Sequence, residues 1–411
     1  MDRALSLVSR FLKSGLILSA LCCGLAACGA SAGEAPAYDL RFEARLLPEN
    51  ASAEVRIIVS QSRSILKTLD FNAPANRFTN ATGPGVSAAE GRIRWRVPAA
   101  GGELRYLATV NSLRGSVHDA RLTESWGVLR LDDLFPPAKA RAVAGTVAEA
   151  TLRLSGPEGW RFETPYGPSN QPVHSITGVR IFPRPVGWMA AGEIGVRRDR
   201  IANRRVAVAA PVGENFRRQD TLAFLRWTLP ELISVFPRFS ERLLIVGSGR
   251  DMWRGGLSGP GSLYLHPERP LISGNATSTL LHELVHVAMG ATPGGREDWL
   301  IEGLAEYYSL EVLRRTGGIS ERRFEDALAR LADWSRREGG HLAEPSKGAN
   351  TAQAVLVLNE LATNLSAQGY RLDALIARLG RGGAFTGAAL DGALDEIDYS
   401  GPRPWQERSP L

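Results

Sequence analysis

The spacing of hydrophobic residues changes about halfway along the chain. Over residues 38–205, apolar and polar residues alternate in short runs such as Val55, Ile57 and Val59. Turn-forming segments, such as NATGPG at 80–85, separate these runs. Alternation with a period of two is typical of strands with one buried face. The pattern therefore predicts an N-terminal all-β sandwich domain over residues 38–205, built of antiparallel strands.

The second half of the chain shows mainly helical spacing, in which apolar residues recur every three or four positions. Two short extended stretches interrupt it, at 243–247 and 262–266. We expect a multidomain chain whose second domain, residues 206–395, is mainly α with a few strands, followed by an irregular tail at 396–411. The predicted helical stretches are 220–236, 277–289, 297–315 and, with breaks, 320–379.

The first residues resemble an export signal. Basic residues precede an uncharged run from Ser14 to Ala32, and within this run the segment LAAC at 25–28 resembles the lipobox of bacterial lipoproteins. The resemblance implies a signal peptide over 1–27, lipidation of Cys28 and a linker over 28–37. Acyl chains on Cys28 would anchor the chain by about 0.8 kcal/mol for each buried methylene. An uncleaved membrane helix and plain signal cleavage are the alternatives.

Composition excludes several classes of site and partner. The only cysteines are Cys22, Cys23 and Cys28, so the exported part has no disulfide, no thiol nucleophile and no cysteine ligand for zinc. The only G-x-S-x-G segment, GASAG at 29–33, lies in the predicted linker directly after Cys28 and not between a strand and a helix, so a serine hydrolase is not expected. The 49 Lys and Arg residues, against 43 Asp and Glu, are scattered along the chain. Nucleic acid is therefore not an expected partner.

The segment HELVH at 282–286 places two histidines four positions apart. On a helix, positions i and i+4 share a face, so His282 and His286 can point at one metal ion. Glu283 is rotated by one residue and can reach a metal-bound water without binding the metal. The alternative is a buried helix with two core histidines.

A second helical segment supplies a third ligand. The stretch 297–315 begins with acidic residues, ends with basic ones and is followed by glycine, which are the signals of one complete helix. Glu302 lies on it, and a spacer of 15 residues after His286 leaves room for a turn and an antiparallel helix. Two histidines and one carboxylate leave a fourth position for water, as a catalytic zinc ion requires. Glu306, one turn further on, can bond the outer nitrogen of a ligand histidine.

These two segments together resemble a known superfamily. HELVH followed by WLIEGLAEYY at 299–308 is similar to the gluzincin metallopeptidases, and within them to the aminopeptidase N-like and glycyl aminopeptidase-like families. The resemblance is tight over residues 276–313. It implies a thermolysin-like α+β catalytic domain behind a β-domain, with one Zn²⁺ held by His282, His286 and Glu302. Glu283 would be the general base that takes a proton from the zinc-bound water.

The chain departs from the aminopeptidase N-like pattern at two places. The segment GGLSGPGSLYLHP at 255–267 lacks the glutamate of the GAMEN segment, which in those enzymes holds the free amine of the substrate. The helix from Asn350 also starts without the tyrosine that stabilises the oxyanion there. Aminopeptidase and endopeptidase action therefore both remain open. As oxyanion donor we favour His341 in a glycine-rich loop, with Tyr308 and Tyr370 as further candidates.

The sequence thus predicts a zinc-dependent peptidase that acts on a peptide or protein and is tethered to the bacterial cell envelope through Cys28. Gly29 follows the lipidated cysteine, where inner-membrane lipoproteins typically carry an aspartate. This favours the outer membrane, facing the periplasm. The alternative function is a binding or scaffold lipoprotein that keeps the peptidase fold and its zinc with little or no hydrolysis.

Overall fold

A computed structural model describes most of the chain. The described residues are 36–167, 173–176, 181–249, 251–290, 298–342, 345–382, 385–403 and 405–406. The predicted signal peptide at 1–27 and Cys28 lie outside them, as does nearly all of the predicted linker. Pro36–Leu411 forms one compact unit. Within the described ranges, no helix has the length and apolar character needed to cross a membrane.

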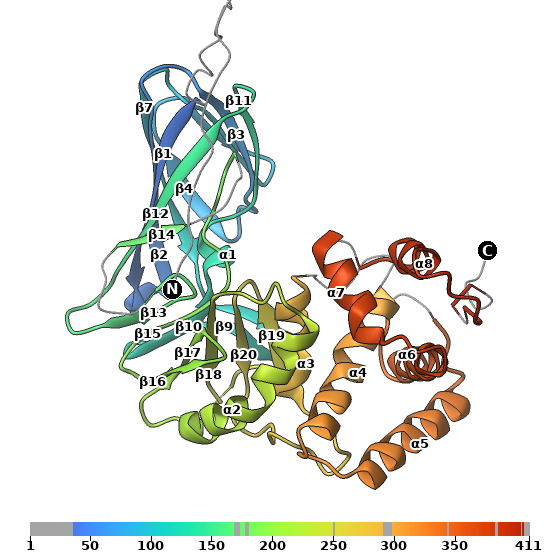
Figure 1. Cartoon of the computed structure of the whole chain (residues 1–411). Helices are drawn as coiled ribbons and strands as arrows, with labels where there is room; N and C mark the ends of the chain where they lie inside the picture. Colours follow the sequence, from blue (N-terminus) through green and yellow to red (C-terminus); the bar gives the residue numbers. More distant parts are fainter. Residues whose placement is uncertain are drawn as a thin grey trace, which may run out of the picture. The chain divides into compact units, whose positions relative to one another are not determined.

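The N-terminal part contains two sheets that share one hydrophobic core (Figure 1). The larger sheet has the order β14 (Val173–Ile176), β12 (Val147–Ser155), β1 (Ala37–Leu47), β2 (Ser52–Ser60), β7 (Gly101–Thr109) and β4 (Phe78–Thr82). The smaller has the order β11 (Ala138–Ala142), β3 (Leu66–Asn72), β6 (Arg92–Arg96) and β5 (Val86–Ala89). Every second residue of β1 from Tyr38 to Leu46 is buried. The prediction of a β-rich N-terminal part is therefore confirmed.

One strand pair differs from the antiparallel expectation. Strand β1 pairs with β12 in parallel, from Ala37 opposite Val147 to Arg45 opposite Ser155. The chain between them passes through the second sheet before it returns. A parallel neighbour requires such a long connection, because a short hairpin can only join antiparallel strands.

A third sheet was not foreseen as a separate layer. Its order is β13 (Arg161–Glu163), β15 (Trp188–Gly192), β10 (Trp126–Arg130), β9 (Val117–Leu122) and β8 (Ser112–Arg114), with a short helix α1 (Leu131–Leu134) after β10. Strand β15, of sequence WMAAG, is buried along its whole length. A strand covered on both faces shows no alternation of apolar and polar residues, which explains why the period-two pattern does not reveal this sheet.

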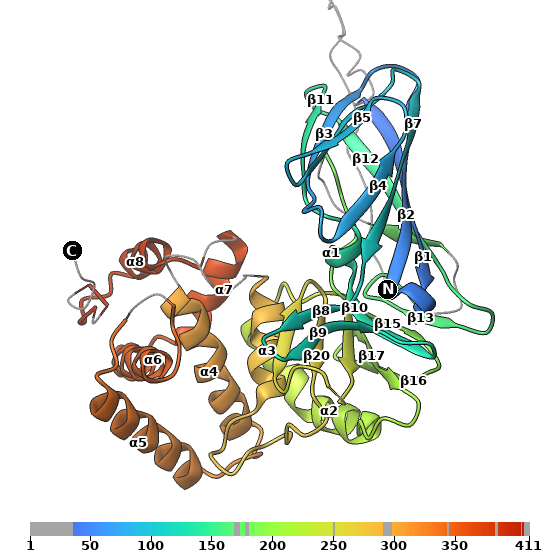
Figure 2. The ribbon, with the colours of Figure 1, turned by 180° about the vertical axis from the view of Figure 1, so that it is seen from behind.

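The fourth sheet packs on the third through a small core that includes Trp188, Leu244 and Tyr264 (Figure 2). Its order is β16 (Ile194–Ile201), β17 (Arg204–Pro211), β18 (Arg242–Gly247), β20 (Ser262–Leu265) and β19 (Gly256–Gly259). Strands β17, β18 and β20 are parallel neighbours, whereas the edge strands β16 and β19 are antiparallel.

The expected domain boundary at 205 falls within a strand of this sheet. Residue 205 belongs to β17, which forms a hairpin with β16, so the sheet of the second domain begins at Ile194. Ala202 and Asn203 at the tip of the hairpin both have positive φ, which suits a tight two-residue turn. The alternation in β16 indicates a strand, but it does not indicate which sheet that strand joins.

Helices complete the second domain. Helix α2 (Arg218–Val235) covers one face of the fourth sheet, and α3 (Thr279–Met289) and α4 (Asp298–Arg315) follow in the same core. The C-terminal helices are α5 (Glu321–Glu338), α6 (Ala349–Ala367), α7 (Leu372–Gly382) and α8 (Gly387–Asp395). The bounds of α2, α3 and α4 lie within about two residues of the predicted stretches, and the C-terminal group extends beyond residue 379.

Candidate metal centre

Helix α3 carries both histidines. It begins after Ser278, whose hydroxyl accepts a hydrogen bond from the Leu281 amide at 3.3 Å, and ends at Gly290 in the left-handed conformation. Both features are standard helix boundaries. Leu281, Leu284 and Val285 are fully buried in the core of the second domain. The burial of this apolar face sets the rotation of the helix. His282 and His286 project from the helix towards α4.

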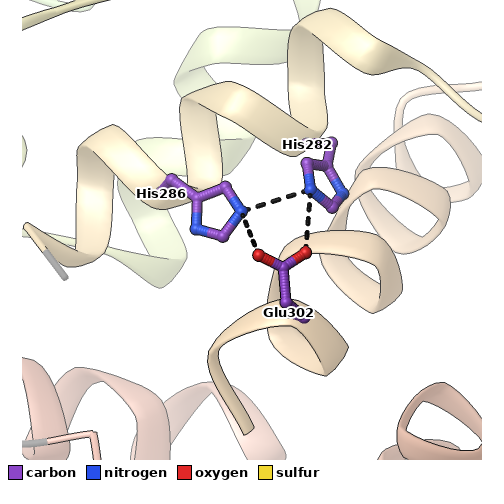
Figure 3. Close-up of side chains that lie close together, drawn as sticks. All are labelled: His282, His286 and Glu302. Carbon is purple, nitrogen blue, oxygen red and sulfur yellow. Dashed lines mark hydrogen bonds and ion pairs between the residues drawn. The ribbon is translucent and has the colours of Figure 1, made fainter. Parts of the chain in front are cut away.

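Helix α4 brings Glu302 to the two histidines (Figure 3). Its other side packs closely against α6, because a Cβ atom on Gly303 would lie only 2.8 Å from the Cβ atom of Ala354. Glycine at this position therefore lets the two helices approach. In the segment WLIEGL, the candidate ligand Glu302 is therefore followed directly by Gly303, the residue that contacts α6.

Potential ligand atoms of three residues face one another. The Nε2 atoms of His282 and His286 are 3.2 Å apart; Oε2 of Glu302 lies 3.4 Å from Nε2 of His282, and Oε1 of Glu302 lies 3.5 Å from Nε2 of His286. Two ligands of a tetrahedral zinc ion, each at about 2.0–2.1 Å, are separated by about 3.3 Å. The three distances fit one such ion. Among the described residues, no other group of His, Cys, Asp and Glu side chains forms a comparable set.

The outer nitrogens of the two histidines have different surroundings. Nδ1 of His282 donates to the Glu306 carboxylate at 3.0 Å, so Glu306 lies where the sequence suggested and directs Nε2 towards the cluster. Nδ1 of His286 is buried and has no hydrogen-bond partner in the described part of the chain. The ring of His286 is therefore held by packing, whereas that of His282 is held by a hydrogen bond.

Electrostatics also distinguish the two histidines. Burial lowers the pKa of His282, but hydrogen bonds with Glu302 and Glu306 outweigh it and hold the pKa well above its usual range. Burial, followed by the nearby charge of His282, holds the pKa of His286 well below the usual range. His286 is therefore neutral at physiological pH, which is the form that binds a metal.

Glu283, on α3, lies against the edge strand β19. Burial raises the pKa of its carboxyl group, which makes it a better proton acceptor at neutral pH. The hydroxyl and backbone amide of Ser258 donate hydrogen bonds to it. A Cβ atom on Gly256 would come within 2.4 Å of the Glu283 side chain. The sequence did not single out Ser258 and Gly256; the paired glycines of GGLSG were the only signal.

None of the candidate oxyanion donors contacts this cluster. His341 is exposed, its Nδ1 lies 3.2 Å from the carbonyl oxygen of Gly339, and its amide donates to Asn350. Tyr308 is fully buried and donates to Asp373 at 3.0 Å. Tyr370 is 39% exposed beside α7. The oxyanion role of His341 thus stays a prediction without a contact that supports it.

Sequence comparison does not place the chain in a family. No protein-family model matches it, and no curated protein resembles it significantly in sequence. The three-dimensional structure, in contrast, resembles many solved structures.

The aminopeptidase N family protein from Idiomarina loihiensis has a TM-score of 0.63 at 14% identity, over 90% of this chain and 73% of its own. Yeast LTA4 hydrolase in complex with bestatin has a TM-score of 0.55 at 12% identity, over 92% and 68%. Native yeast LTA4 hydrolase has a TM-score of 0.53 at 13% identity, over 89% of this chain and only 65% of its own. The aminopeptidase N-like fold expected from HELVH and WLIEGLAEYY is therefore confirmed, at the level of the fold.

Proposed function

We propose that this chain is a zinc-dependent hydrolase of peptide bonds. The observation that carries the proposal is the triangle of His282, His286 and Glu302, whose edges match those of a tetrahedral zinc site, with the Glu283 carboxylate beside it. A zinc ion bound there would polarise the scissile carbonyl and lower the pKa of the attacking water.

In the proposed reaction the protein moves one proton. Glu283 takes it from the attacking water and passes it to the leaving amine. The raised pKa of Glu283 suits both steps, because the carboxylate accepts the proton readily and the carboxylic acid it forms can still release it. The hydrogen bonds from Ser258 hold the carboxylate in place.

The position of β19 supports a peptide substrate. This strand is the last in its sheet, so one of its edges is not paired with another strand of that sheet. An extended peptide can add to such an edge through backbone hydrogen bonds. Helix α3 contacts β19, so a peptide added there would pass close to Glu283. Strand β19 carries no carboxylate, and for that reason internal cleavage and amino-terminal trimming are both kept in the proposal.

Membrane anchoring is a separate part of the proposal, supported by the sequence LAAC at 25–28 alone. Lipid on Cys28 would tether the enzyme to the cell envelope, at the outer membrane on the periplasmic side. Labelling cells with a radioactive fatty acid tests this: incorporation lost in Cys28→Ala supports the anchor, and label that persists in the variant contradicts it.

The hydrolase itself is tested with the full chain, loaded with zinc and incubated with a mixed peptide library whose products are read by mass spectrometry. Glu283→Gln should lower the cleavage rate by a factor of about 10²–10⁴ while it keeps one zinc ion, because the general base is lost but the ligands remain. Glu325→Gln, an exposed change on α5, is the matched control and should cleave like the wild type.

The products also decide the mode of action. Loss of single amino-terminal residues indicates an aminopeptidase, and new internal ends indicate an endopeptidase. A folded, zinc-bound wild type that cleaves no peptide in the library contradicts the hydrolase and favours a binding protein that keeps the fold. Equal cleavage by Glu283→Gln contradicts the role of Glu283.

A further inference from the structure

Three arginines stand in line across the fourth sheet. Arg200 of β16 is the register partner of Arg205 of β17, and Arg205 is the register partner of Arg242 of β18. Register partners on neighbouring strands lie about 4.8 Å apart in the backbone and project from the same face of the sheet. Like charges placed directly opposite each other in this way destabilise a sheet. This row therefore calls for a compensating negative charge.

The protein supplies little of that charge. In the described ranges, the side chains of Arg200, Arg205 and Arg242 make neither an ion pair nor a hydrogen bond. Two carboxylates act on Arg242 through their charge: Glu163, which also pairs with Arg198, and Glu241, which is exposed. Neither forms an ion pair with Arg242 in the described part of the chain. Burial, followed by the charge of Arg205, lowers the pKa of Arg242. The two positive charges are thus close together, with Arg205 exposed and Arg242 partly buried.

Asp199 does not compensate the row either. Its carboxylate accepts a hydrogen bond from Arg226 of α2 at 2.8 Å. Helix α2 packs on the opposite face of the sheet, where Val206 and Leu243 belong to its core. Since alternate residues of a strand point to opposite faces, the side chains of Asp199 and Arg205 project from opposite faces of the sheet.

A cavity of about 470 Å³ lies at this place, and we name it the arginine pocket. It combines charged and apolar walls. Arg198, Arg205 and Arg242 line it together with Ala207 and Leu244 of the same sheet face, and the segment Glu163–Pro165 of the third sheet also borders it. Its volume is within the range of small-molecule sites, about 300–1,000 Å³, and exceeds what a single phosphate group fills.

We propose that the arginine pocket binds a phosphate-bearing organic molecule. The oxyanion would lie between Arg205 and Arg242, and the organic part would pack on Ala207, Leu244 and Pro165. Guanidinium groups present paired donors that match phosphate oxygens, and a bound oxyanion would offset the repulsion between Arg205 and Arg242. Binding would then convert a repulsive pair into two charge-assisted contacts.

The pocket is separate from the metal centre. It lies at the amino-terminal ends of β17 and β18, and none of its lining residues belongs to α3, α4 or β19. Its occupancy can therefore be measured without reference to peptide cleavage, and the inference does not depend on the proposed function.

The first test is thermal unfolding of the full chain in sodium phosphate and in sodium chloride at equal ionic strength. In chloride, Arg205→Gln should melt at or above the wild-type temperature, because one of two repelling charges is gone. In phosphate the wild type should gain stability by ligand binding, and Arg205→Gln should lose most of that gain. Arg322→Gln, at an exposed site on α5, is the matched control and should behave like the wild type in both salts.

Calorimetric titration tests the organic part. Phenyl phosphate should bind the wild type at least about tenfold more tightly than inorganic phosphate, since the ring covers apolar surface. Arg242→Lys keeps the charge but loses the paired donors, and should weaken both ligands. This variant keeps the test decisive if Arg205→Gln does not fold.

Several results would overturn the inference. One is a phosphate-dependent gain in melting temperature that Arg205→Gln retains in full, and another is no gain in the wild type. Equal affinity for phenyl phosphate and inorganic phosphate would show that the apolar wall of the pocket does not bind the organic group of the ligand. The last experiment compares binding to vesicles of phosphatidylcholine with and without phosphatidylglycerol. If Arg205→Gln abolishes binding to the anionic vesicles and phenyl phosphate does not bind the wild type, the oxyanion is a lipid headgroup. That result excludes a soluble ligand.

Discussion

At the scale of single residues, the two histidines of the cluster are held by different means. Glu306 accepts a hydrogen bond from His282 at 3.0 Å, whereas Nδ1 of His286 is buried with no partner among the described residues. An outer carboxylate orients a ligand histidine and increases its basicity. Loss of Glu306 should therefore act on His282 and leave His286 unchanged.

Glu306→Ala should weaken zinc binding about 10- to 100-fold, because the ring of His282 loses the acceptor that directs Nε2 to the metal. Competition with a chromophoric chelator measures the dissociation constant, and circular dichroism checks that the fold is kept. The control is Glu325→Ala, a glutamate removed from an exposed position of α5. An unchanged zinc affinity would show that packing alone orients His282.

At the scale of elements, an ion-pair network fastens the C-terminal end of α4. Arg315 contacts Glu311 at 2.7 Å on the same helix, Asp373 of α7 at 2.8 Å and Glu231 of α2 at 3.1 Å. Tyr308 donates to the same Asp373. Because α4 also carries Glu302, this network helps to hold a ligand-bearing helix against two neighbours.

Arg315→Met should destabilise the protein by about 3 kcal/mol at neutral pH, since it leaves the buried Glu311 and the partly buried Asp373 with fewer partners. We place the cost at the low end of the range for broken buried pairs because Arg314 still contacts Glu311 and Arg371 still contacts Asp373. Urea unfolding measures the change. The exposed change Arg322→Met is the control, and an equal loss in both variants would contradict a role of the network.

The same network predicts a pH dependence. Burial raises the pKa of Glu311 and of Asp373, but hydrogen bonds, chiefly from arginines, outweigh it and leave both pKa values below their usual range. A lowered pKa contributes stability above the unfolded pKa, about 4, and this contribution is lost as the pH falls through the folded value. The stability difference between the wild type and Arg315→Met should therefore shrink below about pH 4, as urea unfolding at several pH values can show.

At the scale of the whole molecule, the C-terminal tail is part of the core. Residues 396–403 and 405–406 form no helix or strand, as expected for this part, yet Tyr399 and Trp405 are buried. Trp405 stacks on Trp299 of α4 with ring centroids 6.4 Å apart, and its indole N–H donates to Asp391 at 3.2 Å. The end of the chain thus covers the start of the helix that carries Glu302.

Trp405→Ala should cost about 3–5 kcal/mol, the range for a buried aromatic side chain. Trp227→Ala is the matched control: this tryptophan is 38% exposed, so its removal should cost much less. Chemical denaturation of both variants gives the comparison. Equal costs would mean that the tail packs loosely on α4.

Much of the fold could be predicted because its signals are local. Alternation in β1 and the capped, amphipathic stretch of α3 each depend on residues close together in sequence, and the structure has both elements where they were expected. Strand β15 and the sheet that β16 joins could not be predicted in the same way. The burial of β15 on both faces and the pairing of β16 with β17 depend on partners outside those segments.

By itself, the sequence determined the helical spacing of His282 and His286 and the helix signals around Glu302, because the i, i+4 geometry needs only the local backbone. Only the tertiary structure decided that Glu302 reaches both histidines, that Ser258 lies against Glu283, and that Arg205 stands opposite Arg242. It also left His341 without a contact to the cluster. The physical reason is that helix packing and strand register bring together residues far apart in the chain, and no local pattern records these contacts.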